Sequence, residues 1–369
     1  MRDLVALDFA LGPDLERAVR EVAESGDAFC VLDRRLSARA RAVELDRLAP
    51  THVLDPGGRR ARPEGRGVED GVGLVMLTSG SSGSPKAAEL NWTALAASAA
   101  ITQATLRDDA PPAWFPCLPA CHIGGLAVVL RGVLSDATLV WGDPERPGTG
   151  PDLGATHVAV VRAQLARLEA ARYRTVLLGG ARPPQALPEN VVTTWGMTET
   201  GSGVVYDRVA LPGVELAIVD GELCVRSPTL FARYRDRPRP AVVGPDGRDD
   251  WFPTGDGARL DDGRLSVFGR LGSVINTGGE KVWPEDLEAV LARVAGVGDV
   301  AVTGLADEEW GERVVALVVA EGRDLDGALR AAAEEAIGPW AKPKEIRYVT
   351  AIPRTPSGKV RRGDLAHVF

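Results

Sequence analysis

Segments typical of helices and of strands alternate along the first half of the chain, and this alternation limits the available folds more than any other feature. In residues 14–25, Leu15, Val19 and Val22 fall on one helical face, and the extended apolar run 28–32 follows. Beyond a loop at 59–66, the pattern continues with strand 72–77, helices 91–106 and 164–171, and strand 175–178. We therefore predict an α/β domain with parallel strands and with binding sites at their carboxyl ends.

The second half of the chain has a different pattern of predicted strands and helices. Short strands separated by turns follow residue 214, and the last two, within 258–268, are typical of a hairpin. A small α+β pattern comes next, with a helix from Pro284, strands 300–303 and 314–319, helix 326–336 and strand 346–349. We predict an α/β fold in which a large N-terminal α/β domain, 1–269, has mixed sheets and a β-rich part. A hinge at 270–272 joins it to a small C-terminal α+β domain, 273–369.

Composition and charge exclude several classes of protein. Hydrophobic residues make up 45% of the 369, which is too many for a disordered chain. The net charge of −8 argues against a nucleic-acid-binding surface. Residues 111–130 lack charged side chains, but four prolines and two glycines make a membrane helix unfavourable there. Acidic Asp3 and Asp8 stand where a signal peptide would be basic and apolar, so we expect a cytoplasmic protein without a membrane span.

Four cysteines in a chain of this length do not form a disulfide scaffold. Cys117, Cys121 and His122 are close enough in sequence to raise the possibility of a metal site. No second close pair of cysteines or histidines follows them. We therefore interpret the cysteines as buried free thiols.

The segment that most clearly indicates chemistry is the Ser/Gly loop after strand 72–77. Hydroxyls and backbone N–H groups in such a loop can surround phosphates, and a lysine adds charge. It is not a Walker A loop, because Pro85 precedes the lysine and Ala87 follows it. A flexible surface loop would leave the arrangement of strand, loop and lysine unexplained. The predicted phosphate-binding residues are Thr78, Ser79, Gly80, Ser81, Ser82, Gly83 and Lys86.

This loop resembles the signature of the adenylate-forming acyl-CoA synthetase superfamily, and further segments resemble the family's other motifs in the same order. The first two are the adenine-side loop Gly179-Gly180-Ala181 and the aromatic motif Trp195-Gly196-Met197-Thr198-Glu199. They are followed by the ribose motif 254–256, the interdomain segment from Gly269-Arg270 to Gly278-Gly279, and the lysine loop 353–359. Each motif is weak alone, but coincidence does not explain their number and order.

The resemblance implies the activation of a carboxylic acid by ATP, with Mg²⁺ as cofactor and CoA as cosubstrate. It implies that Glu199 ligates Mg²⁺, an ion that prefers hard oxygen donors. Asp256 would accept hydrogen bonds from the ribose hydroxyls, and Arg270 would add donors. Lys359 would be the adenylation lysine, stabilising the charge that develops between the carboxylate and the α-phosphate. Thr198 and Lys86 complete the predicted catalytic set.

The resemblance also implies a mobile small domain, because Lys359 lies in that domain whereas the phosphate loop lies in the large one. The family uses two domain orientations, one for each half-reaction. In the second, Gly278 and Gly279 would let the pantetheine arm of CoA approach the backbone. The chain departs from many relatives at Gly272, where they carry Asp or Lys.

Two further segments, 118–131 and 196–207, resemble the o-succinylbenzoate:CoA ligases of menaquinone biosynthesis. This resemblance implies that His122, Gly124, Gly125, Gly201 and Gly203 bind the acid, and we consider Arg162 as a donor to a second carboxylate. Another aryl or medium-chain acid remains an alternative substrate. A non-catalytic nucleotide-binding protein on the same scaffold is a further alternative.

Overall fold

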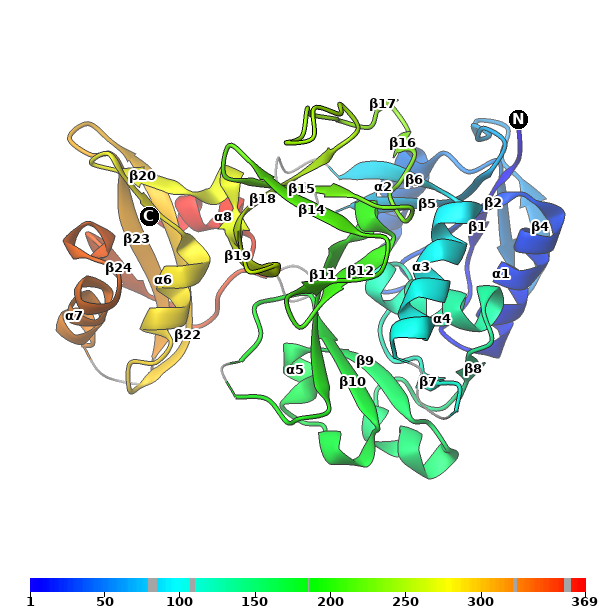
Figure 1. Cartoon of the computed structure of the whole chain (residues 1–369), viewed down its shortest axis with the longest axis horizontal. Coiled ribbons are helices and arrows are strands. Elements are labelled where there is room, and N and C mark those ends of the chain that lie inside the picture. The colour runs from blue at the N-terminus through cyan, green and yellow to red at the C-terminus, as the bar shows by residue number, and fades with distance from the viewer. Residues whose placement is uncertain (79–84, 107–109, 185, 321–323, 355–359) are drawn as a thin grey trace. The chain divides into compact units, whose positions relative to one another are not determined.

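The computed structural model describes residues 1–78, 85–106, 110–184, 186–320, 324–354 and 360–369. Within them the chain divides into two compact units (Figure 1). Unit 1 comprises Met1–Leu216, Val225–Phe252 and Asp262–Leu265. Unit 2 comprises Ala217–Cys224, Pro253–Asp261 and Ser266–Phe369. The predicted domain boundary at 270–272 stays a prediction.

The first sheet of unit 1 has the order β17-β16-β6-β5-β2-β1-β3-β4. Its strands are β1 (Leu4–Leu7), β2 (Ala28–Val31), β3 (His52–Asp55), β4 (Gly58–Ala61), β5 (Val72–Thr78), β6 (Lys86–Asn91), β16 (Arg233–Tyr234) and β17 (Arg237–Pro238). The central strands β5, β2, β1 and β3 run parallel, and the strands on either side of them are antiparallel. Every residue of β1 and β2 is buried, as expected for parallel strands covered on both faces.

The second sheet of unit 1 runs in the order β13-β12-β11-β10-β9-β7-β8. Its strands are β7 (Ala113–Phe115), β8 (Thr138–Leu139), β9 (His157–Val161), β10 (Thr175–Gly179), β11 (Val191–Met197), β12 (Ser202–Tyr206) and β13 (Val209–Ala210). Strands β8, β7, β9, β10 and β11 pair in parallel, whereas β12 and β13 pair antiparallel. The prediction of an α/β fold with mixed sheets is confirmed.

Helices cover these sheets, and α3 and α4 lie side by side (Figure 1). They are α1 (Pro13–Ser25), α2 (Ala38–Leu48), α3 (Trp92–Thr105), α4 (Ile123–Leu134) and the short α5 (Arg162–Leu165). Helix α1 begins with a proline, which suits a first turn, and ends at Gly26 with φ 71°, a left-handed cap that glycine adopts without strain. Its apolar stripe, including the predicted Leu15, Val19 and Val22, is buried.

Four strands that have most of their residues in unit 2 are neighbours in the order β14 (Glu215–Val219), β15 (Glu222–Arg226), β18 (Phe252–Asp261) and β19 (Arg264–Arg270). A separate sheet contains β20 (Ile275–Thr277), β21 (Glu280–Val282), β22 (Val297–Asp307), β23 (Gly311–Ala320) and β24 (Glu345–Tyr348). Helices α6 (Pro284–Leu291) and α7 (Asp326–Ala336) pack on one face with Val300 and Val302 of β22. Ala301 faces the other way, toward Leu365 of α8 (Arg362–Leu365).

Two predicted segments differ from the structure. Residues 59–66, predicted as a loop, begin with strand β4, whose arginines are exposed at the sheet edge, where charged residues are common. The predicted helix 164–171 is instead the short α5 and a 3₁₀ turn at Ala170–Arg172. Hydrogen bonds from Arg167 N to Gln164 O and from Leu168 N to Leu165 O span three residues, which is typical of a tighter helix.

None of the helices in the described ranges has the length and apolar character that crossing a membrane requires. Residues 111–130, the uncharged stretch considered above as a membrane helix, contain β7 and the first part of α4. The four cysteines are free thiols, as predicted, and Cys121 is the one that is not fully buried.

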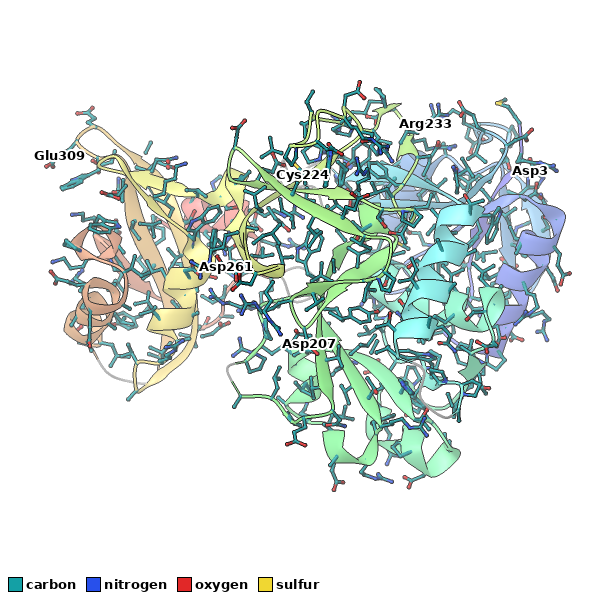
Figure 2. The ribbon with its side chains drawn as sticks, in the orientation of Figure 1. Asp3, Asp207, Cys224, Arg233, Asp261 and Glu309 are labelled. Atoms are coloured by element: carbon teal, nitrogen blue, oxygen red, sulfur yellow. The ribbon has the colours of Figure 1, made fainter. Side chains whose placement is uncertain are left out.

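A buried ion pair holds β16 against β6. Glu89, with 1% of its side chain exposed, accepts hydrogen bonds from Arg235 Nη1 at 3.0 Å and from Arg233 Nε at 2.9 Å. Arg235 is also buried, with 3% of its side chain exposed, whereas Arg233, labelled in Figure 2, is more accessible. Because an unpaired buried charge is costly, the fold requires both members of the Glu89–Arg235 pair.

We expect Glu89→Gln to lower the free energy of unfolding by about 3 kcal/mol, because Arg235 would be left buried without a counter-charge. Urea denaturation measures the change. The matched control is Glu69→Gln, which removes an exposed partner of Arg233 and should cost less than about 1 kcal/mol. Equal effects of the two substitutions would contradict the prediction.

Candidate active site

The ends of the predicted phosphate loop are adjacent in unit 1. Thr78 is the last residue of β5 and Lys86 is the first of β6, and the two are direct partners in the antiparallel ladder. Thr78 is buried and Lys86 is half-buried. The predicted residues between them, Ser79, Gly80, Ser81, Ser82 and Gly83, lie outside the described residues.

Glu199 is a buried carboxylate held by an aromatic hydroxyl. It lies in a 3₁₀ turn, Thr198–Thr200, and is 4% exposed. Tyr234 Oη donates a hydrogen bond to Glu199 Oε1 at 2.9 Å, and Lys86 Nζ lies 5.2 Å from the centroid of the Tyr234 ring. Tyr234 therefore brings the predicted lysine and the predicted carboxylate to the same place.

The alternation of strand β16 explains how Tyr234 reaches this position. Arg233 of β16 and Arg235, which directly follows this strand, both bind Glu89 on one face, so the intervening Tyr234 points to the other face. Phe231 N also donates to the backbone oxygen of Glu199 at 2.8 Å, which fixes the turn beside the strand. The sequence reasoning missed Tyr234. The two arginines spaced two apart around it were the available signal.

Glu199 is suited to hold a divalent cation. Its carboxylate offers hard oxygen ligands of the kind that Mg²⁺ prefers. The described residues provide it with a neutral hydrogen-bond donor but with no ion-pair partner. A buried carboxylate that lacks a counter-charge is expected where a cation binds.

The predicted adenine-side residues lie at the carboxyl ends of two neighbouring parallel strands. Gly179 ends β10, Gly180 follows with φ 84°, and Ala181 is exposed. Trp195, Gly196 and Met197 end the adjacent β11, and Thr198 begins the turn that contains Glu199. A Cβ on Gly196 would lie 2.1 Å from Ser202 O, so β12 approaches β11 too closely for a larger residue. This is where an α/β sheet is expected to bind ligands.

The predicted ribose residues are paired within unit 2. Arg270 Nε lies 3.0 Å from Asp256 Oδ1, and Arg270 Nη1 donates to Thr254 O at 2.7 Å. Asp256 is 8% exposed. The two residues are therefore in direct contact and together present several hydrogen-bonding groups.

The glycines predicted for the second half-reaction form the turn between β20 and β21. Gly278 and Gly279 have φ values of 60° and 87°, a backbone conformation that favours glycine. Both are exposed. Lys359 lies outside the described residues.

The predicted acid-binding residues are found near the start of α4 and after η3 (Thr198–Thr200) in unit 1. His122 precedes α4 with an exposed side chain, and Gly124 is exposed. The other glycines have packing reasons, since a Cβ would lie 2.3 Å from Pro119 O at Gly125 and 2.9 Å from Thr229 O at Gly201. At Gly203 it would lie 3.0 Å from the Tyr206 ring. Their role in binding an acid stays a prediction.

His122 also belongs to a cluster with Asp33 and Cys121, whose potential ligand atoms lie within 4.8 Å of one another. This is the group of metal-ligating side chains that the described residues bring together. Arg35 occupies it, because its guanidinium binds Asp33 through two hydrogen bonds and lies 3.5 Å from Cys121 Sγ. Burial raises the pKa of Cys121 to about 12, so the group is a thiol rather than the thiolate that binds metals. The cluster is organised around an arginine.

A buried cation that sequence reasoning did not select lies on α4. Arg131 is 3% exposed, and its Cζ lies 4.3 Å from the centroid of the Trp114 ring. Its Nη1 has no hydrogen-bond partner among the described residues, and burial lowers its pKa. Arg162, the residue that we considered from the sequence, is exposed at the start of α5.

The arrangement corresponds to a known family. The sequence profile of AMP-binding enzymes matches residues 16–235, and that of the AMP-binding enzyme C-terminal domain matches residues 286–359. The chain therefore belongs to the AMP-binding enzyme family.

Two curated relatives within this family have more specific names. The Mycobacterium tuberculosis protein named "Probable 2-succinylbenzoate--CoA ligase" is 36% identical over 337 residues, which cover 83% of this chain and 86% of the relative. The 2-succinylbenzoate--CoA ligase of Listeria monocytogenes is 32% identical, with 79% of this chain and 69% of the relative covered.

Solved structures share the fold. The o-succinylbenzoate CoA synthetase MenE of Bacillus subtilis, in complex with the acyl-adenylate intermediate OSB-AMP, has a TM-score of 0.84 and 23% identity, covering 98% of this chain and 88% of its own. Escherichia coli MenE with a bound analogue of OSB-AMS has a TM-score of 0.77 and 25% identity. It covers 100% of this chain and 88% of its own. ATP-bound MatB of Rhodopseudomonas palustris also has a TM-score of 0.84, with 22% identity, so the fold is shared with proteins that are not named MenE.

We expect Tyr234→Phe to reduce the free energy of unfolding by about 1–2 kcal/mol, because Glu199 Oε1 would lose its donor in a buried position. The control is Tyr348→Phe. The Tyr348 hydroxyl also donates to a carboxylate, that of Asp326, and it accepts from Leu325 N, but the residue is 42% exposed, so water can replace the hydroxyl in both contacts. Urea denaturation of both variants compares the two, and the prediction fails if Tyr234→Phe is as stable as the control.

Proposed function

We propose that the protein is an o-succinylbenzoate:CoA ligase. In the first step a carboxylate oxygen of the acid attacks the α-phosphorus of ATP, forming the acyl-adenylate and releasing pyrophosphate. In the second step the CoA sulfur attacks the acyl carbon, the thiol proton is lost, and AMP leaves. The observation that carries this proposal is the similarity to 2-succinylbenzoate--CoA ligases over 83% of the chain.

The proposed roles of the residues follow from their chemistry. Glu199 would hold Mg²⁺, which when bound neutralises phosphate charge, and Tyr234 orients that carboxylate. Lys86 and Thr78 bind phosphate from the two ends of the loop. Asp256 and Arg270 bind the ribose. Lys359 stabilises the charge that develops during adenylation.

We propose a hinge at 270–272 and a small domain, 273–369, that changes orientation between the half-reactions. Gly272 has open space around it, since a Cβ there would meet nothing within 4 Å. The glycine is therefore not required by packing, and conformational freedom of the backbone is the remaining physical reason for it. The cytoplasmic location stays a prediction.

Arg131 is the proposed partner of the second carboxylate. A fully buried guanidinium that lacks a counter-ion pays a desolvation cost, which an incoming carboxylate would offset. Support comes from its unpartnered Nη1 and from its position on α4, the helix that follows His122.

We expect Arg131→Met to lower kcat/KM for o-succinylbenzoate by a factor of about 100 or more, because the carboxylate would lose a charge-assisted hydrogen bond. Turnover of an analogue that lacks the succinyl carboxylate should change little. Arg162→Met serves as the control and should leave both substrates unaffected. Equal losses for the two substrates in Arg131→Met would exclude a specific role in carboxylate binding.

The decisive measurement is CoA-thioester formation from o-succinylbenzoate, ATP-Mg²⁺ and CoA, compared with benzoate, succinate and octanoate, with Lys359→Ala as control. We expect turnover of o-succinylbenzoate alone, and its loss in the variant. Turnover of a different acid would keep the ligase chemistry and reject the proposed substrate. Absence of turnover with every acid would favour the non-catalytic alternative.

A further inference from the structure

Asp33 holds Arg35 in a fixed orientation after β2. Arg35 Nε and Nη2 donate to the two carboxylate oxygens of Asp33, both at 2.8 Å, and Arg35 N donates to Asp33 Oδ1 at 3.0 Å. Asp33 is 8% exposed, and its own N–H donates to the Glu44 carboxylate at 3.2 Å. The hydrogen bonds from Arg35 lower the pKa of Asp33, so the pair stays ionised. A two-point contact of this kind fixes the plane of the guanidinium.

The same guanidinium determines which nitrogen of His122 carries a proton. Arg35 Nη2 lies 3.2 Å from His122 Nε2. A guanidinium has donors only and does not lose its proton in proteins, so Nε2 must be the acceptor. The neutral imidazole then carries its proton on Nδ1. Protonation of Nε2 would place two donors and two cations against each other.

We propose that Arg35 is a positioning residue that holds His122 as the neutral Nδ1–H tautomer, so that His122 offers a hydrogen-bond donor to an oxygen of the acid substrate. The tautomer is inferred from the contacts of Arg35 and does not depend on the proposed function. The donor role rests on the proposed function, in which His122 lines the acid site. The segment after β2 thus supplies the residue that orients His122.

Histidine-selective ¹⁵N labelling tests the tautomer without substrate. The chain has four histidines, and His122→Ala identifies the signals of His122. At pH 8 we expect the His122 signals of a protonated Nδ1 and an unprotonated Nε2. In Arg35→Gln they should change to the Nε2–H pattern that free histidine prefers in water. A wild-type His122 with Nε2–H, or an unchanged tautomer in Arg35→Gln, would overturn the proposal.

Arg34→Gln is the matched control, because Arg34 binds Asp8 and makes no contact with His122 in the described structure. It should leave the His122 tautomer unchanged. Unchanged signals of His52, His157 and His367 verify that each variant is folded. A loss of the Nδ1–H tautomer in Arg34→Gln would show that it does not depend on Arg35 specifically.

Kinetics test the donor role. Arg35→Gln should raise KM for the acid about tenfold and leave KM for ATP unchanged, because one hydrogen bond to the acid is lost. An altered tautomer with unchanged KM for the acid would reject the donor role. Failure of o-succinylbenzoate as substrate would reject the proposed function and leave the tautomer result valid.

Discussion

The position of Tyr234 depends on one buried carboxylate, that of Glu89. Arg233 of β16 and Arg235, the residue directly after this strand, both bind it, and this charge pairing fixes the register in which β16 meets β6. Because side chains alternate along a strand, that register sends Tyr234 to the opposite face, against Glu199 and Lys86. An electrostatic requirement on one side of a two-residue strand thereby places a hydroxyl on the other side.

Three buried charges of unit 1 differ in how they are compensated. Glu89 has two cationic partners, Glu199 has a tyrosine hydroxyl, and Arg131 lies on an indole ring. The charge of Glu89 is thus neutralised by the protein's own arginines. The other two leave charge that the described residues do not neutralise, which is costly for a fold without ligands. Such incomplete compensation is typical of positions at which a ligand supplies the opposite charge.

The sequence predicted the fold class, and it indicated candidate nucleotide-binding residues, because both depend on local patterns. Thr78 and Lys86 flank a loop between adjacent strands, and Glu199 follows a strand within one motif. Tyr234, Arg35 and Arg131 were not predicted, because their importance arises from contacts far apart in the chain. Arg35 meets a histidine 87 positions away, and Tyr234 meets a glutamate 35 positions away. The short α5 was mispredicted because an apolar spacing of three residues fits both an α-helix and a tighter turn.

The open surroundings of Gly272 have a practical consequence. A side chain added there meets no atom within 4 Å, and three of the four native thiols are buried, with Cys121 only partly accessible. A cysteine introduced at this position would therefore be the most accessible sulfhydryl in the described structure. A spin label or a fluorophore attached to it would report on the segment between β19 and β20 while the protein turns over. The residue at the centre of the proposed hinge is therefore also the place where its motion can be measured.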